Sequence, residues 1–350
     1  MLEQFLSGLV VRRLSQGTRG ERPDWRHGSW RVLFLRADRI GDMILTTGIL
    51  RAIAQAYPSL TLDVLASPLS APVLAHEPYL NDTIVFDRRR VSGWPVSLAG
   101  LRSRGYDAVI DGAMESPALA TVLLLHASRA RHRIGIRAPG GDAAYTLPVP
   151  PRETAEHYVD KLGALVTAFG LQPTAVDLRP RIRLTAAEAE RGERLWRGET
   201  DDRPAMGKRV LVNVSSVRDA GPWPDDRFVA VIRSVAAAAP RVDVLVISAR
   251  ADHQRAARIA SASGARFVAD NGIRDAMSIV AHADVVFTPE ASIAHAASAF
   301  DKPAVVLHPA GCGRVWGPYR TDGRAVESLS GSVTGITAEE ATRALLARLA

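Results

Sequence analysis

One stretch near the N-terminus constrains the fold more than any other: RVLFLRADRIGDMILTT, residues 31–47. The apolar run 32–35 is typical of a buried strand, and a helical pattern begins near Met43. The polar connection between them contains Gly41 and Asp42. A strand that runs directly into a helix places helix N–H groups and polar side chains at the carboxyl edge of a sheet, where open α/β folds bind ligands. The stretch therefore predicts an α/β fold with Asp42 near a binding site.

The same alternation of strand and helix continues along the chain, which favours parallel sheets covered on both faces. A length of 350 residues is better divided between two domains than built around one core. In the first half, strands are predicted at 60–65, 83–86, 108–110 and 133–136, with helices at 70–76, 95–103, 115–126 and 154–169. In the second half, strands are predicted at 210–214, 242–247, 266–268, 284–287 and 304–307, with helices at 224–238, 251–262, 273–281 and 290–299.

Changes in composition suggest where the domains meet. Residues 172–206 are rich in proline, arginine and acidic residues, and they contain a charged helix and the run LRPRIRL, a candidate short strand. We therefore expect an N-terminal helix and linker over 1–30, a first Rossmann-like domain over 31–171, a linker over 172–206, and a second Rossmann-like domain with a C-terminal helix over 207–350. Two such domains would face each other across a cleft.

The charge of the chain indicates an anionic partner. The net charge is +7, and lysine occurs only at Lys161, Lys208 and Lys302, so the positive charge is carried mainly by arginine. Arginine binds phosphate in a bidentate manner, which suits a nucleotide, a phosphorylated glycan, an anionic membrane or a nucleic acid. Nucleic acid is the least favoured, because the arginines are spread along both halves without aromatic platforms.

The expected location is cytoplasmic. A single cysteine, Cys312, excludes a disulfide framework and a cysteine-rich metal site. The chain has neither a signal-peptide pattern nor the run of about 18 apolar residues that a spanning helix needs. The first residues, MLEQFLSGLVVRRLSQ, place apolar residues and arginines at helical spacing. This helix either lies on a membrane surface, which would make the protein peripheral to the inner membrane, or packs against the domain.

Several nucleotide-binding and catalytic motifs are missing. The first turn lacks G-x-G-x-x-G, which argues against a nicotinamide enzyme, and no P-loop sequence occurs. G-x-S-x-G and H-E-x-x-H are also absent. We expect no cofactor and no metal ion, since the segments around the predicted cleft contain no Asp-x-Asp pair suited to Mg²⁺.

A second stretch, residues 285–308, also joins a strand to a helix. The strand ends near Phe287, and a helix of small residues starts around Glu290, Ala291 and Ser292. Free N–H groups at such a helix start bind anions, so a diphosphate fits on the amides of Ala291 and Ser292. His295 lies one helical turn further. The alternative is an ordinary capped helix start without a bound anion, which has the same sequence pattern.

Taken together, the two stretches resemble a known family. Residues 36–52, R-x-x-R-I-G-D-M-I-L-T-T-G-I-L-R-A, and residues 283–305, ADVVFTPEASIAHAASAFDKPAV, are similar to the ADP-heptose:lipopolysaccharide heptosyltransferases, glycosyltransferase family nine. Further matches, in the same order along the chain, are Tyr57-Pro58, the LDVLA at 62–66, the EPY at 77–79 and the W-P-x-x-R-F at 223–228. The resemblance implies a GT-B fold, with acceptor contacts mainly from the first domain and donor contacts mainly from the second.

The resemblance also assigns roles in the first domain. Asp42 matches the proposed general base of the family; the alternative is an aspartate that only caps the helix. A helix N-terminus should lower the pKa of this carboxyl group, which would keep it ionised but make it a weaker base. Asp38 is a second, nearby candidate for the base, but its position fits a helix cap or a turn better. Arg36 and Arg39 would hold an anionic acceptor or the diphosphate, unless they are simply solvated surface residues.

In the second domain, Glu290, Ala291, Ser292 and His295 match the phosphate-binding segment of the family, although many members have aspartate and Ser/Thr-Gly where this chain has Glu290 and Ala291-Ser292. Asp252 stands where the family often has an acid that binds the nucleotide ribose. Many members have a basic residue before the W-P pair. This chain has Gly221-Pro222 there, and Arg218 would compensate.

The resulting hypothesis is an inverting, metal-independent glycosyltransferase. Its donor would be a nucleoside-diphosphate sugar, ADP-heptose by analogy, and its acceptor a saccharide or glycolipid such as lipopolysaccharide core. Two alternatives stay open: a nucleotide-sugar 2-epimerase on the same fold, and a non-catalytic protein that binds a sugar nucleotide or a glycan.

Overall fold

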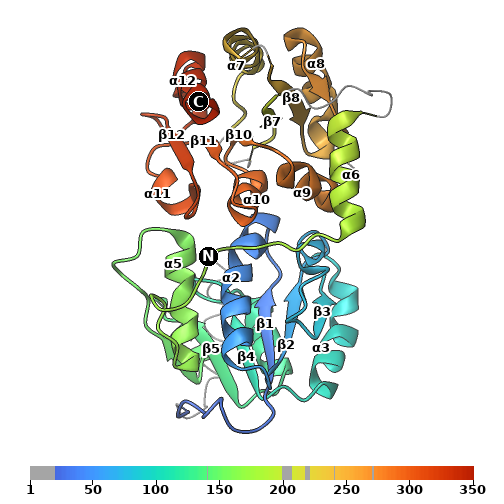
Figure 1. The fold of residues 1–350 in the computed structure, drawn as a ribbon. Helices are drawn as coiled ribbons and strands as arrows, with labels where there is room; N and C mark the ends of the chain where they lie inside the picture. Colours follow the sequence, from blue (N-terminus) through green and yellow to red (C-terminus); the bar gives the residue numbers. More distant parts are fainter. Residues whose placement is uncertain (1–19, 140, 199–206, 217–220, 240, 270–271) are drawn as a thin grey trace. The chain divides into compact units, whose positions relative to one another are not determined.

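The computed structural model describes residues 20–139, 141–198, 207–216, 221–239, 241–269 and 272–350. The chain divides between Pro180 and Arg181 into two compact units. Each unit is built around a six-stranded sheet in which every pair of neighbouring strands is parallel (Figure 1). The predicted α/β architecture with parallel sheets is confirmed.

The first unit has the strand order β3-β2-β1-β4-β5-β6. Helices α3 and α4 pack side by side, and α2 packs with α5 and η4. The strands and helices are β1 (Arg31–Arg36), α2 (Ile40–Ala56), β2 (Thr61–Ala66), β3 (Asp82–Val85), α3 (Trp94–Ser103), β4 (Ala108–Asp111), α4 (Leu119–Ala127), β5 (His132–Ile136), β6 (Leu147–Val149) and α5 (Tyr158–Leu162). The short 3-10 helices are η1 (Ala71–Leu74), η2 (Val91–Gly93), η3 (Asp142–Ala144) and η4 (Gly163–Phe169).

The second unit has the strand order β12-β11-β10-β7-β8-β9. Helix α7 packs between α12 and α8, and α9 packs between α10 and α6. The strands and helices are α6 (Ala186–Arg197), β7 (Arg209–Asn213), α7 (Asp225–Ala238), β8 (Asp243–Ile247), α8 (His253–Ser263), β9 (Arg266–Phe267), α9 (Ile273–Ala281), β10 (Val285–Pro289), α10 (Ser292–Ala299), β11 (Ala304–His308), α11 (Gly313–Trp316), β12 (Gly323–Glu327) and α12 (Ala338–Leu349), with 3-10 helices η6 (Arg250–Asp252) and η7 (Val333–Gly335).

The two sheets share one topology. Counted from its first strand, each has the order 3-2-1-4-5-6, which is that of a Rossmann fold. In such a sheet the order reverses between the first and fourth strands, which are β1 and β4 in the first unit and β7 and β10 in the second. Ligands of open α/β sheets bind outside the carboxyl ends of the strands at this point. The fold therefore indicates one candidate binding region in each unit.

The central strands are held by apolar cores. In the first unit, β1, β2 and β4 are buried along most of their length and mainly apolar, as expected for strands covered on both faces. Trp25, which lies in the stretch predicted to be a linker, is 2% exposed and donates a hydrogen bond from Nε1 to the carbonyl of Ala168. This packing ties residues before β1 to the first unit.

The W-P-x-x-R-F motif builds the core of the second unit. The ring of Trp223 is fully buried, and its Nε1 donates to the carbonyl of Ile336. Trp223, Phe228 and Phe287 pack edge to face, with ring centroids 4.8–6.0 Å apart. Arg227 donates to the carbonyls of Thr334 and Ile336. These motif residues thus connect α7, β10 and the segment before α12.

Several details differ from the expectations. The LRPRIRL run is not a strand, because it pairs with neither sheet. The helix predicted at 154–169 is α5 followed by the 3-10 helix η4, and the one predicted at 70–76 is the 3-10 helix η1. Strands β6 and β12 were not predicted. Helix α2 begins at Ile40 rather than near Met43, which places Asp42 inside its first turn.

None of the helices in the described ranges is both long and apolar enough to span a bilayer. The predicted N-terminal helix lies in residues 1–19, outside the described residues.

Candidate functional site

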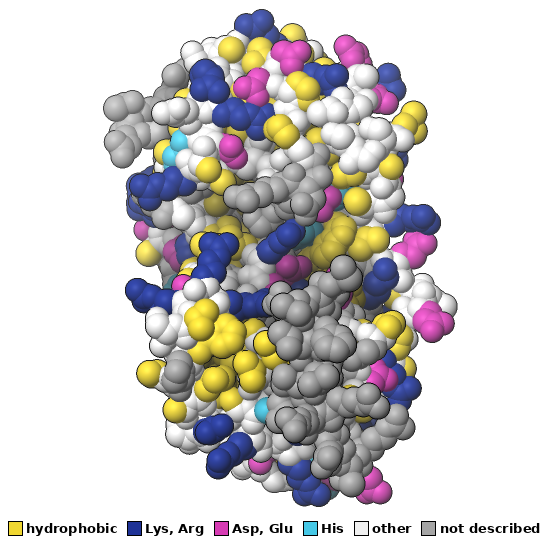
Figure 2. All heavy atoms as spheres, turned by 180° about the vertical axis from the view of Figure 1, so that it is seen from behind, with side chains coloured by type: hydrophobic (Ala, Val, Ile, Leu, Met, Phe, Trp, Pro, Cys, Tyr) yellow, Lys and Arg dark blue, Asp and Glu magenta, His cyan; other side chains and the backbone are white. Residues whose placement is uncertain are grey.

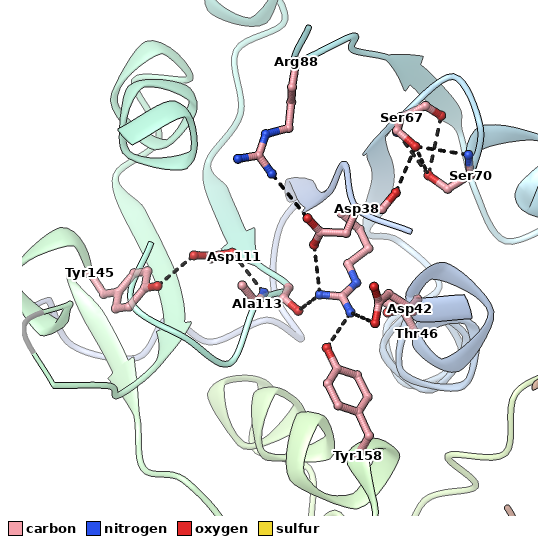
Figure 3. A network of polar contacts seen from close by, with 12 residues as sticks. Asp38, Asp42, Thr46, Ser67, Ser70, Arg88, Asp111, Ala113, Tyr145 and Tyr158 are labelled. Atoms are coloured by element: carbon pink, nitrogen blue, oxygen red, sulfur yellow. Dashed lines mark hydrogen bonds and ion pairs between the residues drawn. The ribbon is translucent and has the colours of Figure 1, made fainter. Parts of the chain in front are cut away.

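A buried arginine organises the carboxyl edge of the first sheet at the reversal point. Arg36, the last residue of β1, is 2% exposed. Its Nη1 donates to the carbonyl of Gly112, just after β4, at 2.5 Å, and its Nη2 donates to the hydroxyl of Tyr158 at 2.5 Å. The same guanidinium lies 3.3 Å from Asp38 and 3.3 Å from Asp42 (Figure 3). Arg36 therefore links the two central strands to both carboxylates.

Asp42 lies in the first turn of α2 and is not its N-cap residue. The N-cap of α2 is Arg39, and the side chain of Asp42 is 19% exposed. Burial raises the pKa of Asp42 above its ordinary value, and Asp38 adds to the rise, whereas Arg36 and Arg39 oppose it. The expectation that the helix terminus would lower this pKa is wrong, because loss of solvation outweighs the favourable charges. A raised pKa makes the carboxylate a stronger base.

Asp38 connects this network to the turn after β2 and to the loop after β3. Its carboxylate lies 3.4 Å from Nη1 of Arg88, and its carbonyl accepts a hydrogen bond from the hydroxyl of Ser67 (Figure 3). Ser67 in turn contacts Ser70, with hydroxyl oxygens 2.8 Å apart. The turns after three neighbouring strands are thus joined by polar contacts at one sheet edge.

A third carboxylate, that of Asp111, belongs to the last residue of β4. Asp111 is 2% exposed, accepts from the hydroxyl of Tyr145 at 2.8 Å and from the backbone N–H of Ala113 at 3.0 Å (Figure 3). Burial raises its pKa to about 6, against the effect of both hydrogen bonds. The ring of Tyr145 crosses β5 at Gly135, where a Cβ would lie 2.2 Å from its Cζ atom. Glycine at 135 is therefore required for Tyr145 to reach Asp111.

The second sheet has a polar network at its own reversal point. Asn213 ends β7 and donates from Nδ2 to the hydroxyl of Thr288 in β10 at 2.8 Å. Ser215, two residues later, donates from its hydroxyl to Asp252 at 2.5 Å and accepts from the N–H of Ala249. The predicted ribose-binding acid is thus fixed by a serine that follows β7.

Helix α10 presents its start at the same edge. Its N-cap is Ala291, whose methyl group cannot cap, and the first N–H groups of a helix have no acceptor within the helix. His295 lies in the second turn and is 7% exposed. Glu290, just before the helix, lies 3.1 Å from Nδ1 of His308, a fully buried residue that ends β11. The arrangement provides amide donors beside one carboxylate.

The structure thus gathers the predicted residues into two groups. Arg36 and Asp42 lie together in the first unit, with Arg39 exposed on the same turn. Asp252 and the segment 290–295 lie at the carboxyl edge of the second sheet. Arg218 falls outside the described residues. Among the residues that the structure describes, no three His, Cys, Asp or Glu side chains are grouped to hold a metal ion.

Sequence reasoning missed five residues of these groups. Asp111, Asn213, Ser215 and His308 are polar residues that end or closely follow apolar strands, and this position was the available signal. The fifth, Tyr158, is the first residue of helix α5 and has no such signal.

Comparison with known proteins identifies the family. The family model described as glycosyltransferase family 9 (heptosyltransferase) matches residues 98–334, more than half of the chain. The match includes α10 and begins after Asp42. Lipopolysaccharide heptosyltransferase 2 of Salmonella typhimurium is 22% identical over 304 residues, which cover 79% of this chain and 82% of that protein.

Solved structures share the fold. A glycosyl transferase family 9 protein from Veillonella parvula superposes with a TM-score of 0.81 at 15% identity, covering 95% of this chain and 99% of the other. The E. coli heptosyltransferase WaaC with ADP-2-deoxy-2-fluoro heptose gives a TM-score of 0.68 at 18% identity, covering 89% and 98%. The predicted GT-B fold is therefore confirmed, and the chain belongs to glycosyltransferase family 9, the heptosyltransferase family.

Proposed function

We propose that the protein is an inverting transferase that moves a sugar, by its family a heptose, from a nucleoside diphosphate to a saccharide hydroxyl such as one in lipopolysaccharide core. The observation that carries the proposal is Asp42, a carboxylate of raised pKa that Arg36 holds at the reversal point of the first sheet. A strong base in a fixed position suits removal of a proton from an acceptor hydroxyl.

The reaction follows from these groups. As the acceptor oxygen attacks the anomeric carbon, its proton passes to Asp42. The bond between the anomeric carbon and the phosphate oxygen breaks, and the diphosphate leaves with the electron pair, so the anomeric configuration inverts. The amides of Ala291 and Ser292, with His295, would stabilise the negative charge that develops on the diphosphate. No metal or cofactor is required for this scheme.

The remaining residues of the second unit fit a nucleotide sugar. Asp252, fixed by Ser215, would accept hydrogen bonds from the ribose hydroxyls. Glu290 would repel a diphosphate, so we assign it to the hydroxyls of the donor sugar. The heptosyltransferase solved with ADP-2-deoxy-2-fluoro heptose supports ADP-heptose as the donor.

These assignments make residues 31–171 the acceptor side and 207–350 the donor side, joined by 172–206. In the first unit, Arg39 is exposed and would contact an anionic acceptor. Arg36 is buried against Asp42, so we assign it to holding Asp42 rather than to contacting the acceptor. We place the reaction on the cytoplasmic side of the inner membrane, because the proposed acceptor is a glycolipid.

The test is release of ADP from ADP-heptose in the presence of heptose-deficient lipopolysaccharide. Replacing the base, Asp42→Asn, should lower turnover by about 10²- to 10⁴-fold. Asp38→Asn is the matched control, because Asp38 contacts the same arginine, and it should retain activity within about tenfold. The thermal shift given by ADP should be the same in both variants. Unchanged turnover in Asp42→Asn would remove the assignment of the base.

A reaction with donor alone separates the alternatives. Incubation with ADP-heptose and no acceptor should leave the sugar unchanged, as read by NMR. An isomerised sugar would indicate an epimerase instead. Absence of a thermal shift with ADP-, GDP-, UDP- and dTDP-linked ligands would count against a donor site altogether.

A further inference from the structure

Helix α10 begins without a capping side chain, although a carboxylate stands next to it. Its N-cap is Ala291, and among the residues that the structure describes no side chain caps the N–H groups of its first turn. Glu290 directly precedes Ala291 and carries a flexible acidic side chain. A carboxylate beside a helix N-terminus is stabilised by the free N–H groups and by the helix dipole. An unrestrained Glu290 would therefore cap α10 itself.

The carboxylate is instead bound by a histidine of the neighbouring strand. Oε2 of Glu290 lies 3.1 Å from Nδ1 of His308, the last residue of β11. The two residues meet because the backbone N–H of Glu290 donates to the carbonyl of Leu307 at 3.0 Å, which aligns the ends of β10 and β11. The carbonyl of His308 accepts from the N–H of Ser328 at 2.9 Å. The backbone that carries the imidazole is thus fixed.

The contact with Glu290 accounts for a histidine at position 308. Histidine contributes only small areas of the face shown in Figure 2, and His308 is fully buried. Its Nε2 has no hydrogen-bond partner in the described part of the chain. Burial of an unpaired polar atom costs free energy, which an apolar residue of similar size would avoid. Because Nδ1 is the ring nitrogen that meets an acceptor, we assign the ring proton to it, so the imidazole donates to Glu290.

A second carboxylate nearby has a different task. Burial raises the pKa of the Cys312 thiol, and the charges of Glu290 and Glu327 add to the rise, so both carboxylates lie near the turn after β11. The two carboxylate oxygens of Glu327 accept from the N–H groups of Gly311 and Gly313, each at 2.9 Å. Oε1 of Glu290, in contrast, accepts no hydrogen bond from any residue that the structure describes. Glu290 is therefore the carboxylate of this pair that can turn toward α10 or toward a ligand.

We propose that His308 holds the Glu290 carboxylate away from the start of α10, and so keeps the amides of that helix free for the anionic group of a ligand. The inference rests on the proposed function, in which those amides bind the diphosphate of the donor. His308 is then a positioning residue, because it acts on the ligand only through Glu290. Held in this way, the carboxylate does not compete with the diphosphate for the same N–H groups, and Oε1 is available to accept from a sugar hydroxyl.

The experiment is calorimetric titration of ADP into the full chain and its variants. His308→Leu removes the Nδ1 donor, so Glu290 should turn to the N–H groups of α10 and raise the Kd for ADP by about tenfold or more. Adding Glu290→Ala to that variant removes the competing carboxylate, and the Kd should return to within about twofold of that of Glu290→Ala alone. His308→Asn, whose amide offers an N–H near the position of Nδ1, should bind ADP like the unaltered chain.

The effect of the second substitution separates positioning from a structural role. A change that merely disturbed the packing around β11 would weaken ADP binding whether or not Glu290 is present. The matched control is His282→Leu. Nδ1 of His282 also meets an acceptor, the carbonyl of Ser278 at 2.8 Å, but this residue lies between α9 and the first residue of β10, at the opposite edge of the second sheet. The control should leave the Kd for ADP unchanged.

Two results would overturn the proposal: an unchanged Kd for ADP in His308→Leu, and a raised Kd that Glu290→Ala does not lower. A different result would refute the proposed function on which the inference rests. If the unaltered chain bound neither ADP nor inorganic pyrophosphate, the amides of α10 would not be a diphosphate site, and the inference would fail with it. Titration of the unaltered chain and of the variants therefore tells the two failures apart.

Discussion

Arg36 and Asp42 form a buried ion pair across the start of α2, with Nη2 of the arginine 3.3 Å from Oδ1 of the aspartate. The same Nη2 donates to the hydroxyl of Tyr158, and Nη1 donates to the carbonyl of Gly112. Arg36 therefore both orients the carboxylate and limits the rise of its pKa. Two opposing effects, burial and this positive charge, set the strength of the proposed base.

Removal of that charge should change the pH dependence of the reaction. Arg36 favours the ionised form of Asp42, so Arg36→Met should raise the pKa of Asp42 and move the acidic limb of the pH profile of kcat/KM upward by about one unit or more. Arg36→Lys keeps the charge and should leave the limb near its original position. An unmoved limb in a folded Arg36→Met variant would contradict the role of Arg36.

The contact between Ser215 and Asp252 predicts an effect on donor binding. Ser215→Ala removes the hydrogen bond that fixes Asp252, so the Kd for ADP should rise by about tenfold, measured by calorimetry. The maximal rate should change much less, because neither residue is assigned to the proton transfer. Ser263→Ala removes a hydroxyl that caps a helix carbonyl elsewhere in the second unit and is the control. An unchanged Kd for ADP would contradict the assignment of Asp252 to the donor site.

An ion pair joins helix α6 to strand β7 within the second unit, which gives a stability prediction. Glu193 accepts two hydrogen bonds from Arg209, at 2.6 and 2.7 Å, and these chiefly lower its pKa to about 2 from 4.5. Because the folded-state pKa is depressed, this stabilisation is complete above about pH 4.5 and is lost as the pH falls toward 2. Glu193→Gln should therefore lower the free energy of unfolding by about 1–2 kcal/mol at pH 7 but not at pH 2. Urea titration measures the difference, and Glu190→Gln, at an exposed position of the same helix, should change little.

Two glycines in helices should respond to alanine in opposite directions. A Cβ at Gly48 in α2 would lie 2.1 Å from the carbonyl oxygen of Leu178, so Gly48→Ala should destabilise the protein by about 1–3 kcal/mol. A Cβ at Gly100 in α3 meets no atom within 4 Å. Gly100→Ala should stabilise the protein by about 0.5–1 kcal/mol, because alanine loses less backbone entropy. Thermal unfolding of both variants checks the pair, and a stable Gly48→Ala would contradict the close packing of α2.

The central strands could be predicted from the sequence because strands buried on both faces are continuous apolar runs, as in β1 and β10. β6 and β12 were not predicted because they are edge strands with little buried apolar surface. One residue of β6 is buried, and none of β12 is. The family could be predicted because its motifs occur in the same order along the chain, and the comparison confirms it. The roles of Asp42 and of the 290–295 segment stay predictions.

The environment of the site could not be predicted. Whether Arg36 is solvated or buried depends on Tyr158 and Gly112, which are distant in sequence. The pKa of Asp42 depends on how much water the surrounding chain excludes. The local sequence pattern does not indicate the burial of this side chain. The same is true of His308 and Glu290, which meet only because β10 and β11 pair.

The contacts of Arg36 also bear on how the protein folds. Gly112 is 76 residues and Tyr158 is 122 residues further along the chain, yet both bind one guanidinium. Asp42 therefore gains its surroundings only after the chain has been made as far as α5 and β4 has paired with β1. During refolding, recovery of the raised pKa of Asp42 would follow the helical signal and coincide with closure of these long loops.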